Sequence, residues 1–143
     1  MVTFRAVLDT TFFVLHYFST DADIQSKSRE VLRLCRRLGN RGILPTIVLA
    51  EFYVQAAKRA GREEAKKLFN EMNNSSLDII DMDVQIAERA ASLRHRHQEK
   101  VPWGDCIVAA SGINNKASII ISEDPHFDEI KEIKTSKLVS VHL

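Results

Sequence analysis

Residues 118–125, Ser-Ile-Ile-Ile-Ser-Glu-Asp-Pro, join a short β-branched run directly to two acidic residues. An all-apolar run of this kind is typical of a strand that is buried on both faces of a parallel sheet. Residues 4–9, Phe-Arg-Ala-Val-Leu-Asp, repeat the design near the other end of the chain. Strand-like and helical patterns alternate between these two stretches. This order predicts an α/β fold with a mostly parallel sheet and helices on both faces.

The remaining hydrophobic patterns place the other helices and strands. Apolar residues recur at helical spacing after Asp23, Pro45 and Asp83, whereas residues 77–80 and 138–141 form short apolar runs. We therefore expect strands at 4–8, 43–44, 77–80, 118–121 and 138–141. We expect helices near Thr11, at 23–38, 46–60 and 63–72, after Asp83, and at 105–112.

Length and composition are those of one ordinary globular domain. The chain has 143 residues, of which 45% are hydrophobic and 27% charged, and a second core would leave each half marginal. We therefore expect a single domain, residues 1–143. No apolar run is long enough to span a bilayer, and the first residues lack the features of a signal peptide. These features predict a cytoplasmic protein without membrane contact, with Cys35 and Cys106 as free thiols.

The net charge of +1 gives no sign of a strongly basic nucleic-acid-binding protein. Basic residues do gather locally, within residues 33–41, 58–67 and 94–100. Such clusters are ordinarily solvated helix faces. They gain meaning only where they border a site that binds anions.

Four acidic residues stand where this kind of fold binds ligands. Asp9 and Asp124 follow the two strand-like stretches. Asp105 opens an expected helix, and Glu51 interrupts an apolar one. Ligand sites in doubly wound folds lie beyond the carboxyl ends of the strands, and a carboxylate inside an apolar segment is costly unless it is paired or binds a metal. We therefore expect the four side chains to form one acidic site.

Each of the four acids also has a purely structural interpretation. Asp9 and Asp105 could cap the helices that follow them or interact with the helix dipoles. Asp124 stands before Pro125, which is the arrangement of a capped helix start. Glu51 could mark the solvent side of an amphipathic helix. Each interpretation is open when the residues are taken singly, and the acidic site is favoured by the set.

Hydroxyl groups and further charged side chains lie beside the acids, at Thr10, Thr11, Ser122, Glu123, His126 and Asp128. The three hydroxyl groups could orient water or phosphate, although short hydroxyl residues at turns usually bond to nearby backbone. We expect the two additional acids to be surface charges. We interpret the histidine as a solvated turn residue rather than a catalytic base.

Several carboxylates in one pocket cannot all stay ionised without compensation. A hard divalent cation provides that compensation through oxygen ligands, and Mg²⁺ or Mn²⁺ suits such a set better than zinc. Ions bound in this way activate water and neutralise the charge on a phosphodiester. The four acids therefore predict an Mg²⁺- or Mn²⁺-dependent hydrolase of phosphodiester bonds.

Four short segments carry the acids: Leu-Asp-Thr-Thr at 8–11, Val-Leu-Ala-Glu at 48–51, Asp-Cys-Ile-Val-Ala-Ala at 105–110 and Ser-Glu-Asp-Pro-His-Phe at 122–127. Together they resemble the four motifs of PIN-domain ribonucleases, in particular of VapC-like toxins. Their order matches that family over essentially the whole chain. Ser122 stands where the family commonly has Thr, and Thr11 where Asn or Ser is frequent.

The resemblance implies a three-layer α/β/α sandwich, an acidic Mg²⁺ or Mn²⁺ site and endoribonuclease activity on RNA. Asp9, Glu51, Asp105 and Asp124 match the family's acidic positions and would be both metal ligands and catalytic residues. The resemblance also implies the toxin of a type II toxin–antitoxin pair, with a small antitoxin protein as partner. A homodimer through the helices 23–38 and 46–60 is implied as well.

Two other functions would use the same edge of the sheet. A catalytically silent PIN-like scaffold that binds RNA or protein is the main alternative, and the presence of all four acids argues against it. A phosphatase or receiver that uses Asp9 as nucleophile or phosphoacceptor would require Asp at the position of Thr11 or Lys at that of Ser122. The sequence therefore predicts a metal-dependent endoribonuclease.

Overall fold

Five parallel strands form the centre of the computed structural model, which describes residues 3–143. They are β1 (Arg5–Leu8), β2 (Arg41–Pro45), β3 (Asp78–Ile80), β4 (Ile119–Ile121) and β5 (Lys134–Ser136). Their order in the sheet is β3-β2-β1-β4-β5, and every pair of neighbours is parallel. The expected α/β class with a mostly parallel sheet is therefore confirmed, and within the described residues the sheet is parallel throughout.

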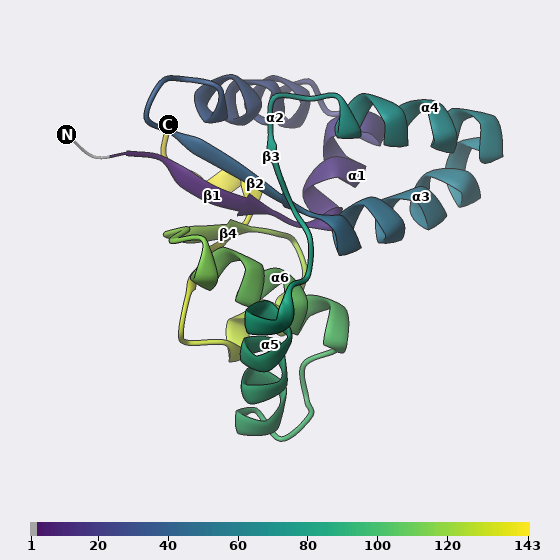
Figure 1. Ribbon diagram of the computed structural model, residues 1–143. Helices are drawn as coiled ribbons and strands as arrows, with labels where there is room; N and C mark the ends of the chain where they lie inside the picture. The colour runs from purple at the N-terminus through teal and green to yellow at the C-terminus, as the bar shows by residue number, and fades with distance from the viewer. Residues whose placement is uncertain (1–2) are drawn as a thin grey trace.

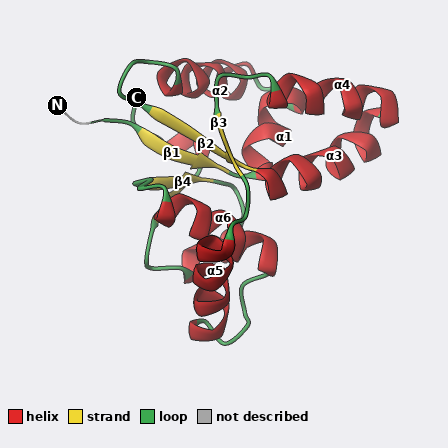
Figure 2. Cartoon of the chain, viewed as in Figure 1, coloured by secondary structure: helices red, strands yellow, loops and turns green. Residues whose placement is uncertain are grey.

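Helices cover both faces of the sheet and complete the expected three layers. Figure 1 shows α2 on one face and α5 and α6 on the other, and Figure 2 shows the strands between them. The helices α3 and α4 form a hairpin that extends beyond the sheet (Figure 1). The six α-helices of residues 3–143 are α1 (Thr10–Phe18), α2 (Ala22–Cys35), α3 (Thr46–Ala60), α4 (Arg62–Asn73), α5 (Val84–Arg96) and α6 (Trp103–Asn114).

Two helix boundaries differ from those predicted. The helix α2 ends at Cys35 instead of reaching Leu38, because the side chain of Asn40 donates a hydrogen bond of 2.8 Å to the carbonyl of Leu34 and closes the helix end. The helix α6 begins at Trp103, directly after Pro102, so Asp105 lies inside its first turn. Proline is well suited to a helix start, since the first turn leaves backbone N–H groups unpaired in any case.

The expected last strand at 138–141 is wrong. The strand is β5, Lys134–Ser136, which pairs with β4, and Leu138–Ser140 form the short 3₁₀ helix η2. The apolar run was predicted as a strand because its side chains are hydrophobic, yet Leu138 and Val141 serve to fill the core. The more polar segment Lys-Thr-Ser can still form backbone hydrogen bonds at a sheet edge, because that pairing does not require apolar side chains.

Buried strands make up the centre of the core. Val7, Leu8 and Ile120 are fully buried, as expected for strands covered on both faces. Cys35 and Cys106 are both buried and form no disulfide bond, as expected for free thiols. Within residues 3–143 no helix is long and apolar enough to cross a membrane.

The packing of α2 onto β2 depends on a glycine. A Cβ atom at Gly42 would lie 2.6 Å from Cδ2 of Leu77 and 2.8 Å from Sγ of Cys35. Distances this short are repulsive, and close-packed cores relax only partly. Gly42 therefore allows the helix to lie directly on the strand that leads to α3.

We expect Gly42→Ala to destabilise the protein by about 1–3 kcal/mol, because an added methyl group overpacks this contact. Urea denaturation measures the change in the free energy of unfolding. Leu77→Ala should cost less in the Gly42→Ala background than in the wild type, because it frees the space that the new methyl group needs. Equal costs in both backgrounds would show that the Leu77 contact is not the source of the strain.

Candidate active site

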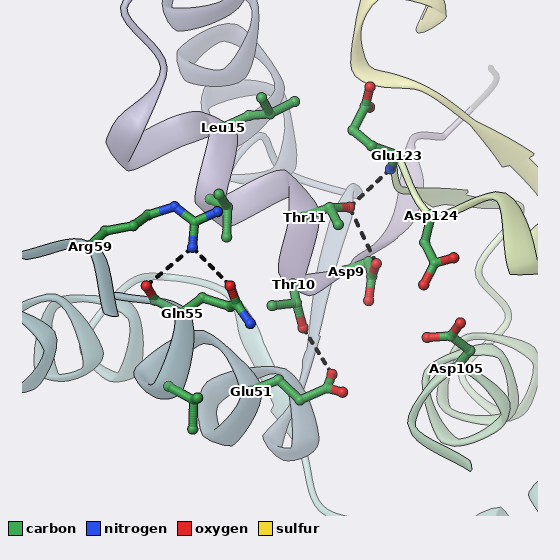
Figure 3. Close-up of a pocket in the computed structure, with 12 residues that line it drawn as sticks. Asp9, Thr10, Thr11, Leu15, Glu51, Gln55, Arg59, Asp105, Glu123 and Asp124 are labelled. Atoms are coloured by element: carbon green, nitrogen blue, oxygen red, sulfur yellow. Dashed lines mark hydrogen bonds between the residues drawn. The ribbon is translucent and has the colours of Figure 1, made fainter. Parts of the chain in front are cut away.

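The four predicted acids meet at the carboxyl edge of the sheet. Asp9 follows β1, Asp124 follows β4, Glu51 comes from α3 and Asp105 from α6. All four line one pocket of about 630 Å³, and Figure 3 shows their carboxylates pointing into a common space. The parallel pairing of Leu8 with Ile121 brings the ends of β1 and β4 together. The structure thus assembles the complete set, and the roles of its members as metal ligands remain predictions.

Two hydroxyl groups hold the carboxylate of Asp9, which is only 3% exposed. Ser122 Oγ donates to its Oδ2 at 2.6 Å, and Thr11 Oγ1 lies 3.3 Å from the same oxygen. Thr11 also accepts a hydrogen bond from the backbone of Glu123 at 2.9 Å, which ties the start of α1 to the segment after β4. Asp9 makes no capping hydrogen bond to α1 with its side chain. Asp9 thus occupies the predicted N-cap position of α1, but its carboxylate is bonded to Ser122 and Thr11 instead of to the backbone N–H groups of the helix.

Glu51 is half-buried and turns toward the other acids rather than toward solvent (Figure 3). Thr10 Oγ1 donates a hydrogen bond of 2.9 Å to its Oε1. Its Oε2 lies against Gly104 of α6, where a Cβ atom would be only 2.8 Å from it. The sequence reasoning missed Gly104, although its place next to Asp105 in a Trp-Gly-Asp segment was a usable signal.

Asp105 has the least compensated carboxylate of the set. Its side chain is buried, with 7% of the residue exposed. Within residues 3–143, its Oδ2 atom is buried without a hydrogen-bond partner. Asp105 faces Asp124 and Glu51 in the pocket (Figure 3). An unpaired buried carboxylate oxygen is rare, because its desolvation is not offset.

Asp124 caps the start of a short helix, as predicted, and also lines the pocket. Its Oδ1 accepts hydrogen bonds from the backbone N–H of His126 at 2.9 Å, at the start of the 3₁₀ helix η1 (Pro125–Glu129). The Nδ1 atom of His126 lies 2.8 Å from the same oxygen and 3.6 Å from Oδ2 of Asp105. His126 therefore contacts two of the acids, which the interpretation as a solvated turn residue missed.

The other two acids have separate surroundings. Glu123 lines the pocket, but its Oε2 accepts a hydrogen bond of 2.9 Å from the backbone of Leu138. Asp128 is exposed on η1 and does not line this pocket. The expectation of a surface charge is therefore confirmed for Asp128, whereas Glu123 helps to join the segment after β4 to η2.

The family of this chain is shown by its sequence. The model of the PIN domain matches residues 6–133, which include all four acids. The chain belongs to the PIN-domain family. No curated protein matches the sequence itself.

Solved structures of VapC toxins share the fold of this PIN domain. The DNA-bound VapBC from Salmonella typhimurium is 20% identical, with a TM-score of 0.74 over 95% of this chain and 99% of that chain. VapBC2 from Rickettsia felis, bound to a promoter fragment, is 18% identical, with a TM-score of 0.72 over 93% and 98%. VapC20 from Mycobacterium tuberculosis, a sarcin-ricin loop cleaving toxin, is 16% identical, with a TM-score of 0.71 over 88% and 95%. At these identities the likeness shows the fold alone.

Burial, followed by the crowding of the acids, raises several of their pKa values in this PIN domain. Burial, and then the neighbouring carboxylates Asp124, Asp9 and Glu51, raise the pKa of Asp105 to about 8. Burial also raises the pKa of Asp9 and of Glu51, although hydrogen bonds from Ser122 and Thr10 work in the other direction. Burial acts upward on Asp124 too, but the hydrogen bonds and charge of His126 lower its pKa overall. Without a cation, the cluster therefore favours binding a proton.

The residues present fit a hard divalent cation. Asp105, Asp124 and His126 each offer a ligand atom, and these atoms lie within 4.8 Å of one another. The Oδ2 atom of Asp105 accepts no hydrogen bond in the described chain, and Nδ1 of His126 lies 3.6 Å from it. Asp9 and Glu51 add carboxylates from the facing elements. An oxygen-rich set of this kind suits Mg²⁺ or Mn²⁺, with water completing the coordination.

Replacing Asp105 by Asn should stabilise the metal-free PIN domain, and increasingly so at higher pH. The pKa of Asp105 is raised in the folded state above its ordinary value of 3.8. The stability that its proton contributes is therefore fully present below about pH 4 and is lost as the pH rises toward about 8. In a chelator, the difference in unfolding free energy between Asp105→Asn and wild type should grow from pH 4 to 8, measured by urea denaturation at each pH.

Asp128→Asn is the matched control, because it removes an exposed carboxylate from the neighbouring segment. It should show no comparable trend with pH. A constant difference between Asp105→Asn and wild type over the same range would mean that the crowding does not perturb Asp105.

Proposed function

We propose that this PIN domain is a metal-dependent endoribonuclease that hydrolyses phosphodiester bonds of RNA. The observation that carries the proposal is the buried Oδ2 of Asp105, which accepts no hydrogen bond and lines a pocket with three other carboxylates of the set. Four acids gathered only to cap helices would not leave such an oxygen uncompensated. We propose Mg²⁺ or Mn²⁺ as the cofactor, held by Asp9, Glu51, Asp105 and Asp124.

The residues around the acids would position the ligands. Ser122 and Thr11 fix the carboxylate of Asp9, and Thr10 fixes that of Glu51. Hydrogen bonds of this kind orient the carboxylates in advance, so that less conformational freedom is lost when a cation binds. A divalent cation bound there would activate water and neutralise charge on the phosphodiester. His126 lies between Asp124 and Asp105, with its Nδ1 atom 2.8 Å from Oδ1 of Asp124 and 3.6 Å from Oδ2 of Asp105.

RNA as the substrate and a toxin role rest on the family. One structural neighbour, VapC20, is a sarcin-ricin loop cleaving toxin, and others were solved as toxin–antitoxin complexes. By this analogy we propose that the chain is the toxin of a type II pair, with a small antitoxin protein as its partner. The catalytically silent scaffold is the competing function, and the same experiment separates the two.

Asn in place of Asp9, Asp105 or Asp124 should each abolish Mn²⁺-dependent cleavage of single-stranded RNA. Asn caps a helix about as well as Asp, so a loss of activity identifies a ligand rather than a cap. Millimolar Mn²⁺ should also raise the melting temperature of the wild type. A hundredfold excess over Kd corresponds to about 2.7 kcal/mol of added stability.

Asp128→Asn should retain both the cleavage and the thermal shift. Full activity in Asp9→Asn or Asp105→Asn would rule out the nuclease assignment. A thermal shift that persists in the Asp9→Asn/Asp105→Asn double variant would place the cation elsewhere. A wild type that binds Mn²⁺ but cuts no RNA would favour the silent scaffold.

We also propose that the chain forms a homodimer through the side of the molecule that carries α3 and β3. The apolar stripe of α2, which was expected to contribute, is buried in the protein's own core through Val31 and Cys35. The strand β3 lies at one edge of the sheet, and Met82, which follows β3 in the chain, is 53% exposed. Residues of this edge and of α3 line an apolar groove, namely Pro45, Ile47, Ala50, Ile80 and Met82.

Light scattering at tens of micromolar should give twice the 16.2 kDa of one chain. Met82→Lys should shift the mass toward the monomer, because it buries a charge in the interface. Val139→Lys is the matched control, since Val139 is 59% exposed on η2, away from that groove. A monomeric wild type would rule out the dimer.

A further inference from the structure

Arg59 is the one cationic side chain among the described residues that line the acidic pocket. It lies near the end of α3, at the opposite end of the pocket from Asp9, Asp105 and Asp124 (Figure 3). Five acids line the same pocket: these three aspartates together with Glu51 and Glu123. The pocket therefore has an acidic end and a basic end.

The guanidinium of Arg59 is held in place. Its Nη1 donates to the side-chain Oε1 of Gln55 at 2.8 Å and to the carbonyl of Gln55 at 3.2 Å. Its Cζ atom lies 6.0 Å from the ring centroid of Phe18. Within residues 3–143 no carboxylate forms an ion pair with it. The guanidinium is thus oriented by neutral groups, and its charge and its other N–H donors remain available.

Helix geometry places this cation along the same face as the acidic site. Glu51, Gln55 and Arg59 follow one another at intervals of four residues, so their side chains lie in one row on α3. Eight residues of α-helix span about 12 Å. The aliphatic side chains of Val14, Leu15 and Val54 also line the pocket, and Val54 is 48% exposed although it is apolar.

We infer that Arg59 binds a phosphate of the RNA other than the one that is cleaved. The inference rests on the proposed function. A polyanion that reaches an acidic cluster meets repulsion there until a cation is bound, so a fixed positive charge at the other end of the pocket gives the strand a favourable first contact. The aliphatic side chains of Val14, Leu15 and Val54 in the same pocket carry no charge and suit the apolar face of a nucleobase.

Arginine is the appropriate residue for this task. Its planar fork matches the oxygens of a phosphate, and the two bonds to Gln55 lower the entropy that it loses on binding. A purely structural role, in which Arg59 only covers Phe18 through a cation–π contact, would not require the N–H donors to remain unpaired inside the pocket. Arg59 lies in the same row of α3 as Glu51 and lines the same pocket, and this position favours a phosphate-binding role over a purely structural one.

The test compares cleavage of a single-stranded RNA in Mn²⁺ by the wild type, Arg59→Ala, Arg59→Lys and Lys58→Ala. Lys58 is the matched control, because it is an exposed cation on the same turn that does not line the pocket. Arg59→Ala should raise KM about tenfold and leave kcat nearly unchanged. The slope of log kcat/KM against log salt should become shallower by about 0.7, as expected for one lost phosphate contact on a single strand. Arg59→Lys should keep the slope and recover part of the affinity.

The substrate provides a second measurement. An RNA with one uncharged methylphosphonate, moved position by position, should raise the KM of the wild type at one position outside the cut. Arg59→Ala should show no such increase at that position. Unchanged KM and salt slope in Arg59→Ala would overturn the inference, as would an equal loss in Lys58→Ala or a change that weakens only the binding of a protein partner. A wild type that cuts no RNA would instead refute the proposed function, and the assignment of Arg59 with it.

Discussion

Repulsion between four carboxylates in one pocket is the constraint on which the site depends. The parallel pairing of β1 and β4 sets Asp9 beside the segment that carries Asp124, and the first turn of α6 adds the buried Asp105. In water these groups would separate, whereas the rigid edge of the sheet holds them together. The strain is relieved when a proton or a cation binds. The raised pKa of Asp105 and the lack of a hydrogen bond to its Oδ2 are two signs of the same condition.

The fold tolerates this crowding because short hydroxyl side chains form hydrogen bonds to the carboxylates. Ser122 and Thr11 bond to Asp9, and Thr10 bonds to Glu51, so that each hydroxyl fixes one carboxylate to a neighbouring element. These bonds also connect α1 to the end of β4 and to α3. Gly104 completes the support, since its missing side chain leaves the room that Glu51 occupies. The geometry of Asp9 and Glu51 is thus maintained by residues that carry no charge.

The distribution of charge along the pocket matters more than the net charge of the chain. A net charge of +1 gives no attraction for RNA as a whole. Under the proposed function, a pocket with acids at one end and Arg59 at the other would accept RNA in one direction once a cation is bound among the acids. Local order in the placement of charges therefore replaces a global basic surface.

The sequence by itself determined the α/β class, four of the five parallel strands of the described residues and the four acids that meet at the sheet edge. Each of these follows from local features, since β-branched runs and acids at strand ends are visible in a few consecutive residues. The tertiary structure alone decided which side chains meet. The bonds from Ser122 to Asp9 and from Thr10 to Glu51, the approach of Gly104 and the contact of His126 with two acids join residues far apart in the chain or unremarkable in it. The strand β5 was missed for the same reason, because backbone pairing at a sheet edge leaves no hydrophobic pattern, whereas packing against the core does.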